Sequence, residues 1–579
     1  MTEPPQATGR RELKPYLLLI APAALIAILP LVLYGCSCGH DFDFHLLSWM
    51  EAARQFNHGT LHPHWAFTPA YNAGEPRFVF YPPLSWYLGG LLGVVLTHLP
   101  GVSGDAAWNA VPVLFTWIAL TASGLTLYRL ARGYASANAA MLAAVLYLAN
   151  PYMLFTAYER TAYAELLAAA WIPLLFEAIL RDEVTVSGIA LPVALLWLTN
   201  APAAVMGSYA LALLALLRTA AIYRDSRLGS LQLAARAAAG FVLGIGLAAV
   251  YIVPAEYERR FVQIAMATIA GMRIDENFLF VHTGTSSDAV LHDQVLRTAS
   301  WIAVALLAAT AAALAVAWIR IRRNRPWAAD FPFLPLWTLA VAIGFLLTPV
   351  SLPLWKLAPQ AAFLQFSWRL LALLAPVLAL AVAAAAARLR VSAAPLAALC
   401  MLLVLLLSAP AYRAFEQPCD AEDTASARLA SFHSPAGTEP TDEYTPVTAD
   451  NDSLSPGDPP YWLAPNPESP PPSGVASGPA PMHLAVTSPR AQEIILNLRD
   501  YPEWRVTLDG ALDPAREPRP DGLIAFPIPA GVSRIDIKYA HTLDETIGDG
   551  ISLLSLAVMI PLFLKAGAGN AERRRTGKS

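Results

Sequence analysis

The sequence predicts a mainly α-helical membrane protein with about 12 to 14 spans and one small extracytoplasmic β-sandwich near its C-terminus. Only 14% of the residues are charged and the mean hydropathy is +0.46, whereas soluble domains usually carry about 25% charged residues. A helix needs about 20 apolar residues to cross a bilayer, and uncharged blocks approaching that length recur along the chain. The blocks are 16–34, 78–98, 108–128, 184–217 (about two short spans), 237–254, 298–319, 331–355, 370–387, 391–411 and 551–564.

Basic residues separate many of these blocks, and their placement predicts the two sides of the membrane. Lys and Arg gather in cytoplasmic loops, so residues 35–77, 255–297, 349–368 and 412–546 are predicted to lie outside the cytoplasm. The predicted cytoplasmic residues are Arg10, Arg11, Lys14, Arg218, Arg224, Arg227, Arg236, Arg320, Arg322, Arg323, Arg325, Arg388, Arg390, Arg573, Arg574 and Arg575.

Arg129 and Arg132 conflict with this assignment. They also look cytoplasmic, but with about 13 spans the sides of all the loops do not agree. Either one span between residues 78 and 217 is miscounted or this loop breaks the bias. The sequence leaves both alternatives open.

The amino-acid composition of the chain changes after residue 411. Residues 451–481 are dense in Pro, Ser and Gly, which predicts a linker or a long loop. Residues 494–498, 504–508 and 535–539 have strand patterns, and Asp509-Gly510 is a turn signal. The predicted division is a multi-span domain at 1–411 with its first external loop at 35–77, an external segment with the linker at 412–481, a β-rich external domain at 482–546, a final span at 547–566 and a basic cytoplasmic tail at 567–579.

The first apolar block follows Arg10 and Arg11, as in a secretory signal, but it is long for one. We therefore expect a retained first helix. Cys36, Cys38 and Cys419 fall on the predicted outer side, where a disulfide can persist. Unpaired or structural thiols are the favoured interpretation, because the Cys-Ser-Cys spacing alone is not a zinc pattern.

Two carboxylates and a histidine come directly after the first block. In an extended segment Asp41, Asp43 and His45 would point the same way. Such a group can serve catalysis as a general base near an acceptor, and Asp41 and Asp43 can bind a divalent metal ion, the one cofactor considered. The alternative is a polar boundary where the helix leaves the lipid. Residues 46–56 have helical spacing and predict a helix on the membrane surface.

Further candidate residues lie at the ends of other blocks. Glu75 and Arg77 precede a Pro-Pro helix start, and they can also be solvated loop charges. Arg160 and Glu165 can pair with each other or face a substrate, because charges at a span end are costly otherwise. Arg369 can hold a phosphate or extend to the interface.

Several absences narrow the function classes. The sequence has no Walker A loop, which excludes an ATP-driven pump of that kind, and no G-x-S-x-G or H-E-x-x-H motif. Few charges lie within the long blocks, which argues against ion-coupled transport. The net charge of −4 says little about partners, and no nucleic-acid partner is predicted.

Taken together, a series of short motifs in order resembles the GT-C class of membrane glycosyltransferases. It is more closely similar to bacterial YfhO-like proteins and to the membrane family labelled "6-pyruvoyl-tetrahydropterin synthase-related". That label does not describe an activity here, because a true pterin synthase is a small soluble zinc enzyme. The motifs are residues 40–45 (HDFDFH), 80–84 (FYPPL), 160–165 (RTAYAE), 365–369 (QFSWR), 438–446 (TEPTDEYTP) and 501–505 (YPEWR).

The resemblance implies an external active site and a lipid-phosphate sugar donor. Asp41 would be the base or metal ligand, with Asp43 and His45 supporting it. The matching motifs imply substrate-binding roles for Tyr81, Arg160, Glu165, Trp368 and Arg369, and Glu75 and Arg77, outside these motifs, are further substrate-binding candidates. One departure is that GT-C transferases often carry Glu-Lys before the Pro-Pro pair, where this chain has Phe80 and Tyr81. Their metal or phosphate contact at that point is therefore missing.

The implied function is transfer of a sugar from a polyprenyl-phosphate donor to an extracytoplasmic envelope acceptor, which is a glycan, a lipid or a protein. The resemblance implies a multi-pass protein of the bacterial cytoplasmic membrane, in contact with membrane lipid and with its β-domain outside. The alternative is a non-catalytic scaffold or a transporter for envelope polymers. An enzyme needs Asp41 beside a lipid-sized groove, whereas a scaffold does not.

Overall fold

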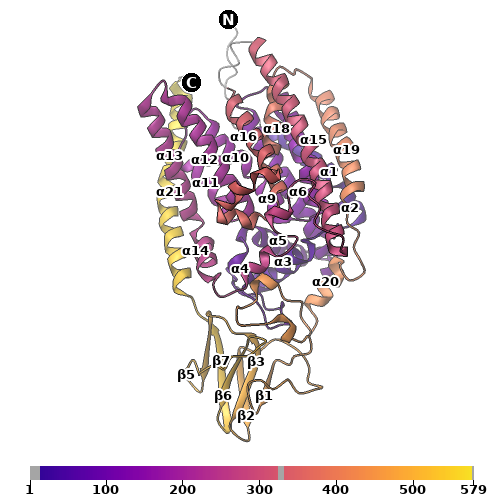
Figure 1. The fold of residues 1–579 in the computed structure, drawn as a ribbon, viewed down its shortest axis with the longest axis vertical. Helices are drawn as coiled ribbons and strands as arrows, with labels where there is room; N and C mark the ends of the chain where they lie inside the picture. The colour runs from indigo at the N-terminus through magenta and orange to yellow at the C-terminus, as the bar shows by residue number, and fades with distance from the viewer. Residues whose placement is uncertain (1–12, 324–330, 577–579) are drawn as a thin grey trace.

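The computed structural model describes residues 13–323 and 331–576. The helices form an elongated bundle, with a β-domain at one end and the start of α1 and the end of α21 at the other (Figure 1). We call these the β-domain end and the terminal end. The predicted cytoplasmic residues Arg10, Arg11 and Arg325 and the last residues of the basic tail, 577–579, lie outside the described residues.

Most helices run between these two ends. Among the described residues nine helices are long and apolar enough to cross a membrane, or up to ten with the pair α16–α17, which bends by 95°. Leu18–Ala27 and Val186–Trp197 are shorter apolar helices in the same bundle. The helices of the bundle are α1 (Leu13–Ala27), α2 (Leu29–Tyr34), α6 (Gly104–Ala131), α7 (Ala137–Leu148), α8 (Pro151–Tyr158), α9 (Tyr163–Ala168), α10 (Ile172–Leu180), α11 (Val186–Trp197), α12 (Ala201–Tyr223), α13 (Arg227–Leu247), α14 (Ala249–Glu258), α15 (Ser287–Arg323), α16 (Phe333–Leu346), α17 (Leu352–Lys356), α18 (Leu371–Ala385), α19 (Ala393–Phe415) and α21 (Leu543–Thr576).

Several predicted spans are broken, and the breaks have local causes. Between α7 and α8 the side chain of Asn150 accepts hydrogen bonds from the backbone of Tyr152 and Met153, and Pro151 occupies the first turn. A capping side chain followed by proline is a strong helix start, so the span restarts there. The two pieces together still form one membrane-length segment, Ala137–Tyr158.

The predicted span at 78–98 does not cross the bundle. Its helix is α5 (Pro83–Thr97), preceded by the short α4 (Arg77–Phe80). At the start of α5 the backbone N–H of Leu84 donates to the carbonyl of Leu198, 2.7 Å away. Beyond its end, Asn109 of α6 donates to Ser426 of α20 (Ala425–Phe432), which lies near the β-domain. Both ends of α5 are therefore at the β-domain end.

This placement resolves the conflict over Arg129 and Arg132. With α5 no longer counted as a crossing, α6 brings these residues to the terminal end. There the backbone N–H of Ser136 donates to the carbonyl of Ala387, next to the basic residues that follow α18. The alternative of a miscounted span is therefore correct, and Arg129 and Arg132 lie at the same end as the other basic loops.

The segment 46–56 is helical as predicted, but it is not a surface helix. It belongs to α3 (Phe42–Asn57), and the residues buried along it cover more than one face. Trp49 packs where a side chain on Gly89 of α5 would clash, because an added Cβ would lie 2.2 Å from the indole. Close approach of α3 and α5 thus requires glycine at this position.

A disulfide joins Cys38 to Cys419, which are 381 residues apart. The expectation that these thiols are unpaired is therefore wrong for this pair, whereas Cys36 and Cys400 are free. The disulfide ties the loop before α3 to the segment after α19. The hydroxyl of Ser37 strengthens the same junction by accepting from the backbone N–H of Gln417 at 2.9 Å.

The β-domain consists of two antiparallel sheets with orders β1-β3-β6 and β2-β7-β4-β5. Apolar residues of both sheets, such as Ile494, Phe526, Val506 and Ile537, share one core, which is the arrangement of a β-sandwich. The segment 451–481 is not only a linker, because it supplies β1. The strands are β1 (Tyr461–Ala464), β2 (His483–Ser488), β3 (Gln492–Arg499), β4 (Trp504–Leu508), β5 (Ala511–Leu512), β6 (Leu523–Ile528) and β7 (Gly531–Tyr539).

The position of α5 can be tested with single cysteines in a Cys36→Ser background. Leu99→Cys, just after α5, should react with a membrane-impermeant maleimide from the same side as Leu512→Cys in the β-domain. Asp225→Cys, between α12 and α13, should react only from the opposite side. If Leu99→Cys labels together with Asp225→Cys, α5 crosses the membrane and this topology is wrong.

Candidate functional site

The site begins where the loop after α2 meets the loop between α8 and α9. The backbone N–H of Asp41 donates to the carbonyl of Arg160 at 3.0 Å. Gly39 makes this approach possible, since a Cβ there would lie 2.2 Å from the carbonyl oxygen of Glu159. Thr161 has a φ of +48°, a strained backbone conformation that is common at functional sites. Two distant loops thus hold Asp41 in place.

Arg160 is buried and ion-paired. Its guanidinium donates to the carboxylate of Glu165 at 2.6 Å and stacks over the ring of Trp368 with its central carbon 4.8 Å from the ring centroid. Tyr152 donates its hydroxyl proton to the same carboxylate. The sequence alternative in which Arg160 and Glu165 pair with each other is therefore correct.

Arg369 approaches the same carboxylate. Its Nε lies 3.4 Å from Glu165, while its terminal nitrogen donates to the carbonyl of Leu364 at 2.9 Å. The preceding Gln365 has a φ of +60° and accepts a second hydrogen bond from Arg369. Arg369 is therefore held inside the protein and does not extend along a lipid interface.

Two guanidinium groups thus share one buried carboxylate, which leaves an excess of positive charge. Asp41 adjoins this pair through its backbone hydrogen bond to Arg160, and its charge acts on both guanidinium groups. Asp41 is only partly buried, so it can meet a ligand from outside. The arrangement is a carboxylate beside a pair of fixed cations, which can accept a proton on one side and hold an anion on the other.

His45 and Tyr81 complete this cluster. The Tyr81 hydroxyl lies 3.3 Å from Nε2 of His45, and His45 is 1% exposed. Burial lowers the pKa of His45 from 6.5 to about 4, because the interior disfavours the charged imidazole. His45 is therefore neutral at pH 7, and it positions Tyr81 without adding to the local positive charge.

Asp43 lies apart from this cluster. Because α3 already begins at Phe42, the segment is helical, and residues two apart on a helix do not share a face. The Asp43 carboxylate accepts from the backbone of Phe44 and lies 3.8 Å from Arg428 of α20. The expectation that Asp41, Asp43 and His45 point the same way is wrong for Asp43.

Glu75 and Arg77 form a separate buried pair. Arg77 donates to Glu75 at 2.7 Å and to Thr441 at 2.9 Å, and the backbone N–H of Thr441 donates to Glu75. They are therefore neither solvated loop charges nor part of the Asp41 cluster. Their effect is to dock the 438–446 segment onto α3 and α4, where Arg77 also stacks over Phe44 at 4.7 Å.

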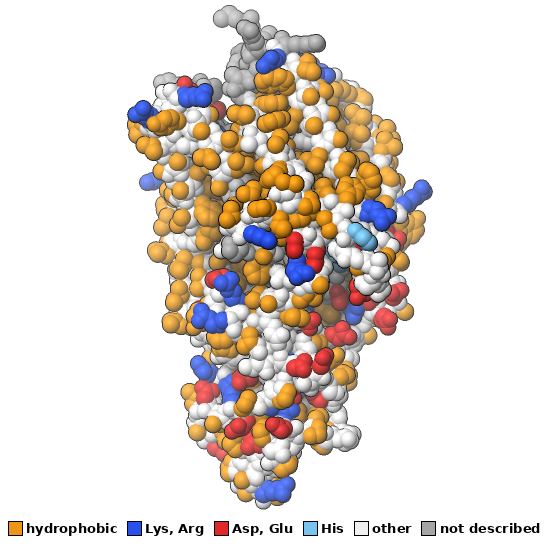
Figure 2. Space-filling view, viewed as in Figure 1, with side chains coloured by type: hydrophobic (Ala, Val, Ile, Leu, Met, Phe, Trp, Pro, Cys, Tyr) orange, Lys and Arg blue, Asp and Glu red, His pale blue; other side chains and the backbone are white. Residues whose placement is uncertain are grey.

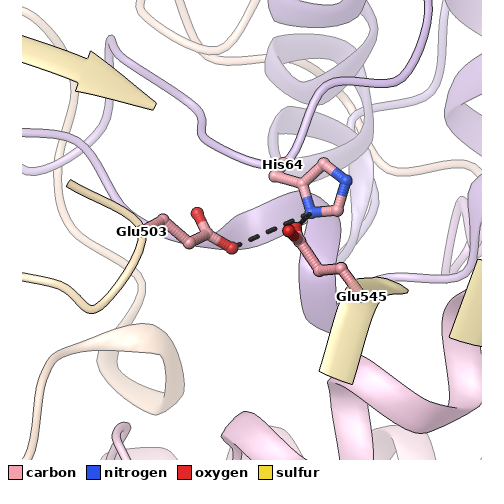
Figure 3. A group of neighbouring side chains, drawn as sticks. All are labelled: His64, Glu503 and Glu545. Carbon is pink, nitrogen blue, oxygen red and sulfur yellow. Dashed lines mark ion pairs between the residues drawn. The ribbon is translucent and has the colours of Figure 1, made fainter. Parts of the chain in front are cut away.

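Sequence reasoning missed a second polar cluster. His64 of the first loop, Glu503 before β4 and Glu545 of α21 place one ligand atom each within 4.8 Å of the others (Figure 3). All three residues are buried. The motif at 501–505 contains Glu503, but nothing in the local sequence links it to His64 or Glu545. A cavity of about 420 Å³ near this part of the β-domain is lined by residues such as Phe261, Tyr501 and Arg516.

Fold and site together define a multi-pass membrane protein whose polar clusters gather at the β-domain end. No family model matches the chain, and no curated protein matches it. The similarity to YfhO-like proteins and to the pterin-synthase-related family therefore stays a prediction.

Among solved structures, the chain is similar to the arabinofuranosyltransferase AftD from Mycobacteria, with 19% identity and a TM-score of 0.44. That match covers 75% of this chain and 29% of AftD. It is also similar to the oligosaccharyltransferase of Archaeoglobus fulgidus, with 15% identity and a TM-score of 0.38, over 72% of this chain and 57% of that one. The same enzyme tethered to an acceptor peptide gives 17% identity, a TM-score of 0.39 and coverages of 70% and 56%. The chain thus spans less than a third of AftD and just over half of the archaeal enzyme.

Glu165→Gln should destabilise the fold strongly. The substitution leaves two buried guanidinium groups without their shared anion, and breaking a buried ion pair costs about 3–5 kcal/mol. Asp43→Asn is the matched control, because its half-exposed carboxylate should change stability by no more than about 0.5 kcal/mol. Unfolding titrations in detergent, followed by tryptophan fluorescence, measure both. Equal stability of the two variants would contradict the assigned role of Glu165.

Proposed function

We propose that this protein is an integral membrane glycosyltransferase that moves a sugar from a polyprenyl-phosphate donor to an extracytoplasmic acceptor. The observation that carries the proposal is the position of Asp41 beside Arg160 and Arg369, two buried guanidiniums that share the carboxylate of Glu165. A base next to a fixed anion-binding pair is what direct displacement at a sugar phosphate requires.

In the proposed reaction, an acceptor hydroxyl attacks the anomeric carbon of the donor. Asp41 takes the hydroxyl proton as the new C–O bond forms. The bond from the anomeric carbon to the lipid phosphate breaks, and the phosphate leaves with the electron pair. Arg369 and Arg160 stabilise its negative charge, since guanidinium groups match phosphate oxygens in geometry. Tyr81, held by neutral His45, and Trp368 line the same place and orient the donor.

A divalent ion shared by Asp41 and Asp43, as the sequence predicts, does not fit their positions, because Asp43 faces Arg428. Among the described residues, the group of three ligand atoms close enough for a metal is His64, Glu503 and Glu545, away from Asp41. The proposed steps therefore use Asp41, Arg160 and Arg369 without a metal ion.

Orientation follows from charge and from the disulfide. Hydrophobic side chains cover the helical part, and acidic side chains gather towards the β-domain (Figure 2). Basic residues such as Arg129 and Arg388 belong to the terminal end, which the positive-inside bias assigns to the cytoplasm. The Cys38–Cys419 disulfide lies at the other end, where an oxidising compartment preserves it. We place the protein in a bacterial cytoplasmic membrane, with the β-domain outside.

The β-domain is the proposed acceptor-orienting unit. The 438–446 segment lies between it and α3, and Arg499 of β3 donates to Asn451 just after that segment. The cavity of about 420 Å³ beside Tyr501 combines aromatic with charged side chains, a combination that suits a sugar-containing acceptor. The alternative of a scaffold or transporter needs none of these features near Asp41.

Asp41→Asn should abolish transfer. Loss of a general base typically lowers the rate by a factor of about 10² to 10⁴, whereas Asp43→Asn, two residues away and outside the cluster, should stay within about twofold of wild type. The assay uses purified membranes and a panel of radiolabelled polyprenyl-phosphate sugars, and it follows label into acceptor material. Unchanged transfer by Asp41→Asn would refute the assigned base. No transfer from any donor by the wild type would favour the scaffold or transporter.

A further inference from the structure

The junction between the β-domain and the bundle holds a concentration of buried carboxylates. Glu258, Glu503, Asp544 and Glu545 are each no more than 7% exposed, and they gather around His64. The ion pairs that the described residues make with these four carboxylates are all with histidines. Several negative charges in a dry site are unfavourable unless protons or a cation balance them.

The carboxylate of Glu503 is the most deeply buried member of this cluster. It is 0% exposed, and neither of its carboxylate oxygens has a hydrogen-bond partner within residues 13–323 and 331–576. One of these oxygens lies 3.8 Å from Nδ1 of His64 (Figure 3). A fully buried carboxylate without a single donor is rare in a native protein. An unfilled position between Glu503 and His64 would explain it.

The histidine has the arrangement of a metal ligand. Nε2 of His64 lies 3.2 Å from Nδ1 of His62. If Nε2 carries the proton and donates it to His62, the Nδ1 lone pair of His64 faces the carboxylates. Metal-bound histidines commonly have such a partner on the far nitrogen. The Nδ1 atom of His64 also lies 2.6 Å from a carboxylate oxygen of Glu545, so the nitrogen and the two carboxylates converge on one point.

Hydrogen bonds from outside the cluster also hold Glu545 in place. Its carboxylate accepts hydrogen bonds from the Tyr539 hydroxyl and from the backbone of Thr542, the latter at 2.7 Å. Nearby, Tyr501 donates to Glu258 at 2.8 Å. These donors orient Glu545 and Glu258, whereas Glu503 has no donor among the described residues.

We propose that His64, Glu503 and Glu545 bind one divalent cation of the Zn²⁺ or Mn²⁺ kind, with Glu258 and Asp544 next to it. Their ligand atoms span no more than 4.8 Å, and a tetrahedral zinc site with bonds of about 2.0–2.2 Å separates its ligands by about 3.3–3.6 Å. One imidazole nitrogen among carboxylates favours Zn²⁺ or Mn²⁺ over Ca²⁺ or Mg²⁺.

The ion would be structural. It joins three segments that are remote in sequence, namely the first loop, the start of β4 and the start of α21. These segments come from the membrane domain, the β-domain and the final span, so the ion fixes the β-domain against the bundle. Metal binding to such a site contributes to folding stability. The inference does not depend on the proposed transferase function, because no step of that reaction passes through this site.

Metal content of the tag-free, full-length protein tests the proposal. The protein is purified in detergent, stripped with EDTA, incubated separately with Zn²⁺, Mn²⁺ or Ca²⁺, desalted and analysed by mass spectrometry for metal. The wild type should retain about one Zn²⁺ or Mn²⁺ per chain and little Ca²⁺, and the retained ion should raise its apparent melting temperature. Glu503→Gln should lose at least tenfold in bound metal and show no such rise.

Glu493→Gln is the matched control. Glu493 also lies in the β-domain and also has a carboxylate oxygen without a hydrogen-bond partner, but it is outside the cluster. This variant should bind metal like the wild type. If Glu503→Gln does not elute as a folded monodisperse species, His64→Gln takes its place. A wild type that retains no Zn²⁺ or Mn²⁺, or a Glu503→Gln variant that retains as much as the wild type, overturns the proposal in favour of protonated carboxylates or adventitious binding.

Discussion

Glu165 is the anion on which the polar end of the helical bundle depends. It lies at the start of a membrane-length helix and holds Arg160 at 2.6 Å and Arg369 at 3.4 Å. Neither guanidinium could stay in this apolar setting without a counter-charge. Because both arginines are fixed from the same side chain, the loops that carry them are fixed as well. Asp41 then takes its position from the backbone of Arg160, so the candidate base follows from the buried pair.

Covalent and backbone links extend this constraint outward. The Cys38–Cys419 disulfide and the hydrogen bond from Gln417 to Ser37 anchor the loop before α3 to the chain after α19. The buried Glu75–Arg77 pair then docks the segment around Thr441 onto α3. Each link joins segments several hundred residues apart. Together they collect the outer loops into one surface at the β-domain end of the bundle.

The β-domain contributes its own polar contacts to this surface. Glu503 precedes β4, and Tyr539 ends β7, so the same sheet supplies a ligand candidate and the donor that orients Glu545. The sandwich itself is held by apolar residues of both sheets. The buried carboxylates of Glu258, Glu503 and Glu545 lie at its junction with the bundle. Acids in that place are costly for folding, which is the physical reason to expect a cation there.

The sequence by itself determined the class of the protein. Two patterns were sufficient to predict the helical bundle and the sandwich: apolar blocks of membrane length with basic residues between them, and alternating segments near residues 494–539. Burial in lipid requires the apolar blocks, and the pleat of a strand requires the alternation. The motifs also included Asp41, Arg160, Glu165 and Arg369, which the fold brings together.

Tertiary structure decided the rest. An uncharged segment has the same composition whether lipid or protein covers it. Only the packing of α5 against α3 therefore shows that α5 does not cross the bundle. The helix that begins at Phe42 turns Asp43 away from Asp41. His64, Glu503 and Glu545 meet only because the chain folds back on itself. Local sequence carries no information about contacts between segments so far apart.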